Sequence, residues 1–266
     1  MQPKMNKTEI AEIVRAAKKG DTNRVLEIID TTGMHIDAAV DRDQNTLLHI
    51  ASSMGHETLV VALVERGANT NPTSVWRITP LHRCAARGFD QIASALIKHG
   101  ADVDRVDDKG STPLHWAAAN EKVGTAKLLL AKTVNVDCAN QIDGTAMHIA
   151  VRRGLFTLVE ALLERGADVN RTDVDGKTPL EIARCYSIFS QPSESESMMA
   201  ILQRAVRNAE VARLIGMTLL LKPLALPTLV VYTIYCSLRP NCQSGRRDMH
   251  AAWKTIAQIK HTVNEL

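Results

Sequence analysis

The chain has 266 residues, of which 45% are hydrophobic and only 3% aromatic, and its formal net charge is +3. This length allows one elongated domain or two small ones, and so small a charge does not favour a nucleic-acid partner. The five cysteines are scattered and form no C-x-x-C pair, which is typical of reduced thiols rather than of a disulfide or metal framework. The amino terminus lacks the apolar core of a signal peptide, so we expect a cytoplasmic or nuclear protein.

Residues 8–40 have the apolar spacing of two short helices separated by Gly20-Asp21. The remaining positions of the first of these helices are mostly charged. A polar outer face is what a terminal repeat of a stacked array needs for solubility. We therefore expect a degenerate amino-terminal capping repeat over 8–40.

A seven-residue phrase recurs through the centre of the chain. It reads Thr-Pro-Leu-His-Trp-Ala-Ala at 112–118, and its threonine returns every 33 residues. The five threonines are Thr46, Thr79, Thr112, Thr145 and Thr178. A fixed period of this length indicates a stacked repeat architecture.

The phrase also has a physical meaning. A threonine side chain can cap the start of a helix, and a proline beside it suits the first helical position. A second apolar stretch follows about ten residues later and ends at Gly-Ala turns, such as Gly67-Ala68 and Gly100-Ala101, where glycine suits a left-handed helix end. Each repeat therefore reads as helix, turn, helix and loop, with too little apolar surface to fold alone.

Over residues 38–190 this pattern resembles the ankyrin repeat family. The resemblance implies an all-α solenoid of about six helix-turn-helix repeats with hairpin loops and a concave recognition face. It also implies a scaffold or adaptor that binds a partner protein rather than an enzyme.

The repeats after the cap begin at residues 41, 74, 107, 140 and 173, and are called repeats two to six. Three of them depart from the family pattern. Gln44 stands where a loop glycine is usual, the tip of repeat three (74–78) lacks the usual Asp and Gly, and Glu121 replaces the glycine between two helices. In repeat six, the acidic Ser/Glu segment 190–197 predicts a flexible loop insertion, with Ser197 capping a helix from Met198. We expect the repeat domain to span 1–209.

Residues 210–266 lack the repeat pattern and read as an apolar stretch followed by a basic amphipathic helix. The stretch 214–238 carries one charge, Lys222, and is long enough to cross a membrane. A helical cap on the open end of the solenoid, or a partner-binding helix, explains its apolarity equally well. Residues 224–227 are faintly similar to the end of a SOCS box, which would imply a substrate adaptor of a ubiquitin ligase. All three readings stay open at this point.

Catalytic and metal sites are not expected. The motif histidines His49, His82, His115 and His148 would be too far apart to share one ion, so we expect them to hold turns by hydrogen bonds. The sequence contains no Gly-rich phosphate loop and no H-E-x-x-H motif. We therefore expect no cofactor, no metal and no small-molecule substrate.

Partner-binding residues are expected where the repeat pattern leaves positions free to vary. The residue after each motif histidine should face the concave side, as should the next turn of the same helix. The positions after the histidine are Ile50, Arg83, Trp116, Ile149 and, after Glu181, Ile182. The binding site that we predict comprises Trp76, Arg77, Arg83, Arg87, Trp116, Asn120, Arg152 and Arg153. Trp and Arg dominate binding hot spots, so we expect a partner segment with acidic and apolar groups. The alternative is that Trp116 packs on its neighbours and the arginines are merely solvated.

Three side chains are candidates for modification. Ser193 and Ser195 lie among glutamates, as the targets of acidophilic kinases do. Asn170 resembles a position that is hydroxylated in some ankyrin proteins.

Overall fold

A computed structural model of the chain describes residues 7–186 and 192–220. The chain divides into two compact bodies, Met1–Leu202 and Gln203–Leu266. The first body contains the repeats. Of the second body, the described part is the helical stretch 203–220.

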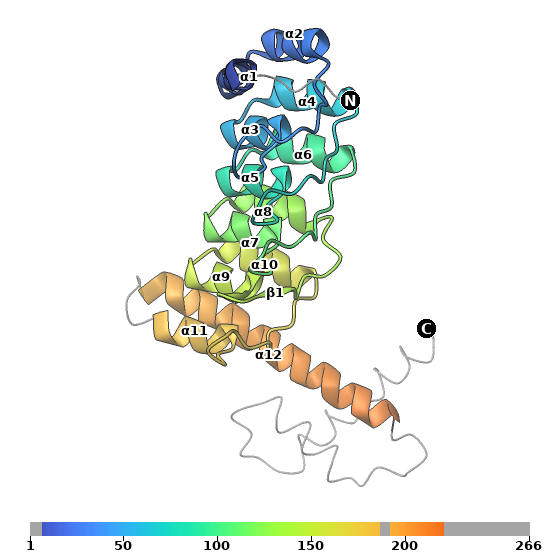
Figure 1. The fold of residues 1–266 in the computed structure, drawn as a ribbon. Coiled ribbons are helices and arrows are strands. Elements are labelled where there is room, and N and C mark those ends of the chain that lie inside the picture. Colours follow the sequence, from blue (N-terminus) through green and yellow to red (C-terminus); the bar gives the residue numbers. More distant parts are fainter. Residues whose placement is uncertain (1–6, 187–191, 221–266) are drawn as a thin grey trace, which may run out of the picture. The chain divides into compact units, whose positions relative to one another are not determined.

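The described residues form helices and one short β-hairpin (Figure 1). Their bounds are α1 Lys7–Lys19, α2 Thr22–Thr32, α3 Leu47–Met54, α4 Glu57–Glu65, α5 Pro80–Arg87, α6 Asp90–Lys98, α7 Pro113–Ala119, α8 Val123–Leu130, β1 Ala139–Asn140, β2 Gly144–Thr145, α9 Ala146–Arg152, α10 Phe156–Glu164, α11 Pro179–Tyr186 and α12 Pro192–Leu220. The first helices of the repeats (α1, α3, α5, α7, α9 and α11) stack in one layer, and α2, α4, α6, α8 and α10 stack in a second. The predicted all-α solenoid of helix pairs is confirmed.

Each first helix from α3 to α9 begins with a capping box formed by the motif threonine and histidine. In α5, Thr79 and His82 cap each other's backbone N–H groups, and Thr46, Thr112 and Thr145 do the same with their histidines. These bonds satisfy donors that a helix start otherwise leaves unpaired. The sequence phrase therefore encodes the start of the helix directly.

The second ring nitrogen of each motif histidine reaches the next repeat. The Nε2 atoms of His49, His82 and His115 lie 2.9, 3.0 and 3.2 Å from the carbonyl oxygens of Ile78, Ser111 and Gly144. A carbonyl oxygen can only accept, so Nε2 carries the proton and Nδ1 accepts from the threonine. Each neutral histidine thus joins two consecutive repeats, which accounts for the structural role expected of it.

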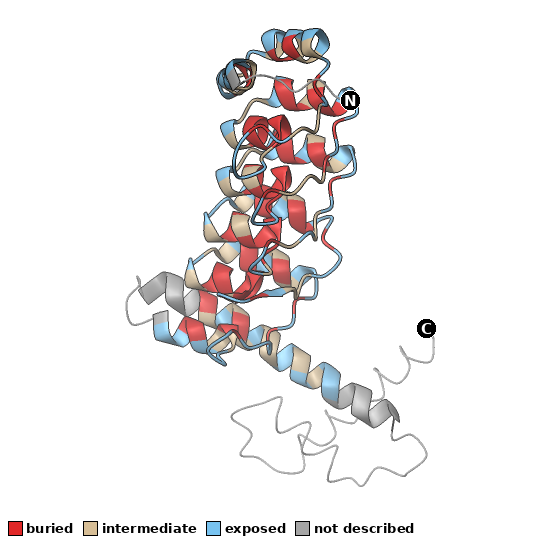
Figure 2. Cartoon of the chain, in the orientation of Figure 1, coloured by how far each residue is buried: buried red, intermediate tan, exposed pale blue. Residues whose placement is uncertain are grey.

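The hydrophobic core runs between the two layers of helices (Figure 2). The leucine position of the phrase is buried at Leu48, Leu81, Leu114 and Met147. Across from it, the second helices contribute Leu63, Leu96, Leu129 and Leu162, all fully buried. Burying one such side chain contributes about 2 kcal/mol. Met198 and Leu202 at the start of α12 are also buried in this core, so this part of α12 serves as the second helix of repeat six.

The residues that replace glycine at three positions of the repeats have the backbone conformation of the glycines. Gln44, Arg77 and Glu121 have φ values of 59°, 56° and 61°, in the left-handed region that glycine favours. The equivalent glycines of repeat four and repeat three, Gly110 and Gly88, have φ values of 76° and 82°. The fold therefore requires the left-handed conformation at these positions even where the residue is not glycine.

The start of α12 differs from the prediction. The helix begins at Pro192 rather than at Met198, so most of the predicted 190–197 loop is helical. A proline suits the first turn of a helix because its fixed φ is already helical and its missing N–H costs nothing there. The helix then continues through the predicted domain boundary at residue 209.

The apolar stretch 214–238 is described only in part. Its first seven residues belong to α12, and the others lie outside the described residues, as does the predicted helix near the carboxyl terminus. Within the described part of the chain, no helix has the length and apolar content needed to cross a membrane.

The stability of the stack should fall when the motif histidines are protonated. Burial lowers the pKa of His82 from 6.5 to about 4 and also lowers the pKa values of His49, His115 and His148. Between these pH values the unfolded chain binds protons that the folded chain does not. The stabilisation that the neutral histidines provide should therefore be complete above pH 6.5 and should be lost as the pH falls toward 4. For His82 alone, the free energy of unfolding should fall by roughly 3 kcal/mol over this range. Urea denaturation at a series of pH values measures this slope.

His82→Gln removes one titrating ring and should flatten that slope. Val134→Ala, at a position that is 89% exposed and has no titrating group, should leave it unchanged. Equal slopes for the wild type and His82→Gln would show that His82 does not contribute to the pH dependence of stability.

Replacing Glu121 by glycine should increase the stability of the fold. Glu121→Gly relieves a left-handed backbone, which costs a non-glycine residue about 1 kcal/mol, and removes only an exposed ion pair with Arg153. We expect the free energy of unfolding to rise by roughly 0.5–1 kcal/mol in urea denaturation. At the equivalent position of repeat two, Gly55→Ala should do the opposite. There φ is +85°, and an added Cβ would lie 2.8 Å from the Phe89 ring.

Candidate interaction surface

The hairpin tips of adjacent repeats are joined through their backbones. The N–H of Val75 donates to the Asp43 carbonyl at 2.9 Å, and the N–H of Asp108 donates to the Trp76 carbonyl at 3.2 Å. The tip of repeat three is therefore held between those of repeats two and four. On this fixed backbone, the Trp76 side chain is 59% exposed, and Arg77 beside it is also exposed.

Trp116 on α7 has a structural role as well. Its indole Nε1–H donates to Asp107 Oδ2 at 2.9 Å, and its ring meets His82 edge-on with centroids 5.6 Å apart. The other oxygen, Asp107 Oδ1, accepts the N–H groups of Lys109 and Ser111. Trp116 thus braces the hairpin of its own repeat, with the side chain half-buried. One turn later, Asn120 is exposed and donates to the Trp116 carbonyl at 2.8 Å.

Arg83 and Arg87 lie one helical turn apart on α5. Arg83 is half-buried and Arg87 is exposed. Within the described residues, no carboxylate oxygen lies within ion-pair distance of either side chain. Burial lowers the pKa of His49, and the positive charge of Arg83 adds to that effect. Among the described residues, the two arginines of α5 therefore have no carboxylate as an ion-pair partner.

Arg152 and Arg153, which were predicted for the same site, are paired inside the chain. Arg152 donates to Asp143 Oδ1 at 2.8 Å and to the fully buried carboxylate of Asp173. Burial alone would raise the pKa of Asp173, but backbone N–H groups and Arg152 together lower it. Arg152 is thus an internal brace between the hairpins of repeats five and six, and Arg153 pairs with Glu121 at 3.4 Å.

The expectation that every residue after a motif histidine faces outward is wrong for the isoleucines. Ile50, Ile149 and Ile182 are only 7%, 4% and 2% exposed. These β-branched side chains belong to the hydrophobic core, where burial is favourable. Only Arg83 and Trp116 of this set reach the surface.

Three exposed apolar side chains at hairpin tips were not among the residues predicted for binding. Val75, Ile142 and Val174 are 45%, 48% and 55% exposed. They occupy tip positions that are polar in repeat four, as Asp108 and Lys109 show. Large apolar residues at polar loop positions were the available signal.

The modification candidates are placed only in part. Asn170 is exposed, and its N–H donates to Asp168 Oδ1 at 2.9 Å. Ser193 and Ser195 belong to the first turn of α12, but their side chains lie outside the described part of the structure.

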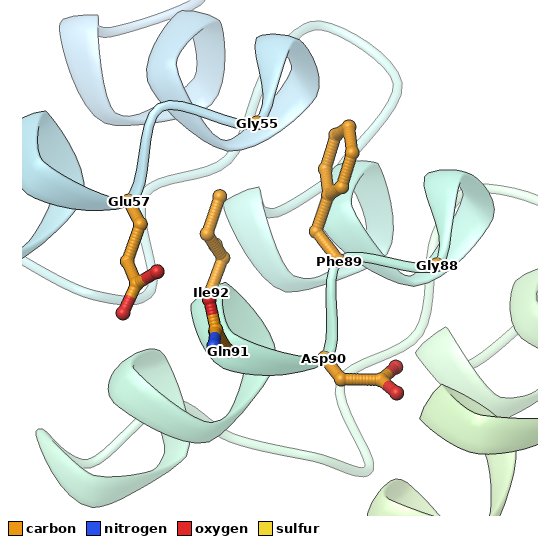
Figure 3. Close-up of a pocket in the computed structure, with 7 residues that line it drawn as sticks. All are labelled: Gly55, Glu57, Gly88, Phe89, Asp90, Gln91 and Ile92. Atoms are coloured by element: carbon orange, nitrogen blue, oxygen red, sulfur yellow. The ribbon is translucent and has the colours of Figure 1, made fainter.

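A pocket of about 380 Å³ opens between the inter-helix turns of repeats two and three (Figure 3). Its lining includes Glu57, Phe89 and Asp90 and none of the residues predicted for binding. Asp90 accepts a hydrogen bond from the Thr125 hydroxyl, so its carboxylate already has a structural partner. The described residues contain no group of three or more His, Cys, Asp or Glu side chains placed to hold a metal ion.

Comparison with known families matches most of the first body. A model described as ankyrin repeats (3 copies) matches residues 68–140, and two described as ankyrin repeats (many copies) match residues 13–64 and 129–183. The comparison with curated proteins gave no match.

Neighbouring arginines should differ sharply in their contribution to stability. Arg152→Gln leaves the buried Asp173 carboxylate without its cation, and breaking a buried pair typically costs about 3 kcal/mol. Arg153→Gln removes an exposed pair and should cost less than about 0.5 kcal/mol. Urea denaturation of the two variants measures the difference. Equal losses would show that Arg152 is not a brace.

Proposed function

Because the chain belongs to the ankyrin repeat family, we propose that it is a non-catalytic scaffold or adaptor that grips a partner protein through repeats three and four. Ankyrin repeats are generally protein–protein interaction modules. The free thiols of Cys84, Cys138 and Cys185 support a reducing compartment such as the cytoplasm or nucleus.

The observation that carries this proposal is the exposure of Trp76. An indole on a backbone that is already fixed gives up little conformational freedom on binding, and Trp is among the commonest hot-spot residues. Val75 extends the apolar surface at the same tip. About half of the surface of each of these two residues is open to solvent within the described chain.

The charges favour one type of partner segment. Arg77, Arg83 and Arg87 supply positive charge from the tip and the first helix of one repeat, so an acidic segment with apolar residues is complementary to it. Trp116 and Asn120 border this surface on α7. Arg152 and Arg153 have internal carboxylate partners, and we leave them out of the proposed surface.

Removing the Trp76 side chain should weaken partner binding without changing stability. Proximity labelling with the full-length chain identifies its neighbours, and capture of those proteins is then compared for wild type and Trp76→Ala. A hot-spot tryptophan contributes about 2 kcal/mol or more, so affinity should fall roughly 30-fold. The melting temperature should stay the same because the indole is mostly exposed.

Val134→Ala is the matched control. Val134 is 89% exposed in the loop after α8, so it tests whether any exposed apolar side chain matters. Undiminished capture by Trp76→Ala would remove repeat three from the binding surface. Trp116→Phe, which keeps the ring packing against His82, tests the indole N–H separately.

A further inference from the structure

Repeat three lacks a side-chain acceptor that the other hairpins have. The first hairpin residue is Asp or Asn in the four other repeats, namely Asp41, Asp107, Asn140 and Asp173, and is Ser74 in repeat three. In each of those four repeats a side-chain oxygen of this residue accepts loop N–H groups at 2.6–3.1 Å. The Ser74 side chain is buried, and its hydroxyl oxygen has no hydrogen-bond partner among the residues that the structure describes.

The second carboxylate oxygen of the aspartates also has a defined role. In repeat four, Asp107 Oδ2 accepts from Trp116 on the first helix. In repeat six, Asp173 Oδ2 accepts from Arg152 of the preceding repeat. In repeats four and six the carboxylate therefore joins a donor on a first helix to the hairpin, whereas in repeat two Asp41 Oδ2 accepts from Asn45 Nδ2 within the hairpin.

Arg83 occupies the position of Trp116 one period earlier in the chain. The N–H of Ser74 donates to the Ile78 carbonyl at 2.9 Å, and the Nε2 of His49 bonds the same oxygen. Ser74 likewise occupies the position of Asp107, whose Oδ2 accepts from Trp116 at 2.9 Å, so the repeat places Ser74 and Arg83 at two positions that meet in repeat four. In repeat three, Arg83 supplies a donor. Ser74, however, has no carboxylate to accept from it, as Asp107 accepts from Trp116 in repeat four.

Other unfavourable features gather in the same repeat. Arg83 and Arg87 are like charges at i and i+4, which repel. Arg77 holds a left-handed backbone with φ of 56°. The equivalent positions of repeat four have Trp116, Asn120 and a glycine, so that repeat avoids these costs. Breaches of local rules concentrated at one place are typical of functional sites.

We propose that repeat three is a receptor for a carboxylate of the partner, with Arg83 and Arg87 as its ligands and Ser74 as the residue that keeps the position open. This inference rests on the proposed function and names the group that the surface recognises. Arginine binds carboxylates through two parallel N–H donors. The missing internal group is itself a side-chain carboxylate, which favours Asp or Glu of a peptide over a phosphate.

The sharpest test restores the internal carboxylate. Full-length wild type, Ser74→Asp and Arg83→Gln are applied to an array of random dodecapeptides, in which each acidic peptide has an amide counterpart. The array also carries phosphopeptides. Wild type should bind its selected acidic peptides at least tenfold more tightly than the amide versions. Ser74→Asp should lose about tenfold for the acidic peptides and nothing for the amides, because the new carboxylate occupies Arg83. Arg83→Gln should lose the same preference.

Lys98→Gln is the matched control, since it removes an equal charge from the second helix of the same repeat. It should keep the acidic preference, and Ser74→Asp should melt no lower than wild type. Absence of an acidic preference in wild type, an unchanged preference in Ser74→Asp, or selection of phosphopeptides over carboxylates would each overturn the proposal. Trp76-dependent capture of a partner can survive any of these results, so failure here is distinguishable from failure of the proposed function.

Discussion

The stack depends on one hydrogen bond that recurs between repeats, from the Nε2–H of a motif histidine to a carbonyl oxygen of the next hairpin. The same ring accepts from the threonine at the start of its own helix, as His82 does with Thr79. A single neutral side chain therefore fixes both the helix start and the position of the following repeat. Stability in such an array is close to a sum of repeat and nearest-neighbour terms, and this bond belongs to both.

The end of the array follows from the same bond. In repeat six, Glu181 takes the place of histidine, and its carboxylate accepts from the N–H and hydroxyl of Thr178. A carboxylate can complete the capping box but has no N–H to donate onward. The substitution therefore keeps the local function of the residue and gives up the link to a following hairpin. The bond from Thr178 also lowers the pKa of Glu181, which keeps the acceptor ionised.

The sequence phrase was sufficient to predict the helix pairs, because caps, turns and core positions are all local to it. It was also sufficient to locate Gln44 and Glu121 as residues in glycine positions, and to place a further departure within the tip 74–78. Exposure could not be read in this way. Ile50 and Arg83 occupy equivalent positions in the repeat, yet Ile50 is buried in the core and Arg83 reaches the surface. At the same backbone position, an apolar side chain is favoured inside and a charged side chain is favoured in contact with water. The pairing of Arg152 with Asp173 was missed because it joins two repeats across a hairpin whose glycine is shifted to Gly144.

Equivalent positions in a repeat protein share one backbone environment, so their differences isolate side-chain chemistry. Position 107 holds a carboxylate that binds two loop N–H groups and a tryptophan. Position 74 holds a hydroxyl that binds nothing among the described residues. In the same repeat, an arginine occupies the position of Trp116, and the hairpin tip carries an exposed tryptophan and an arginine with a left-handed backbone. The Ser74 hydroxyl without a partner, the like charges on α5 and the left-handed backbone of Arg77 are each unfavourable. In our proposal a carboxylate from outside the chain offsets the repulsion between the two arginines of α5.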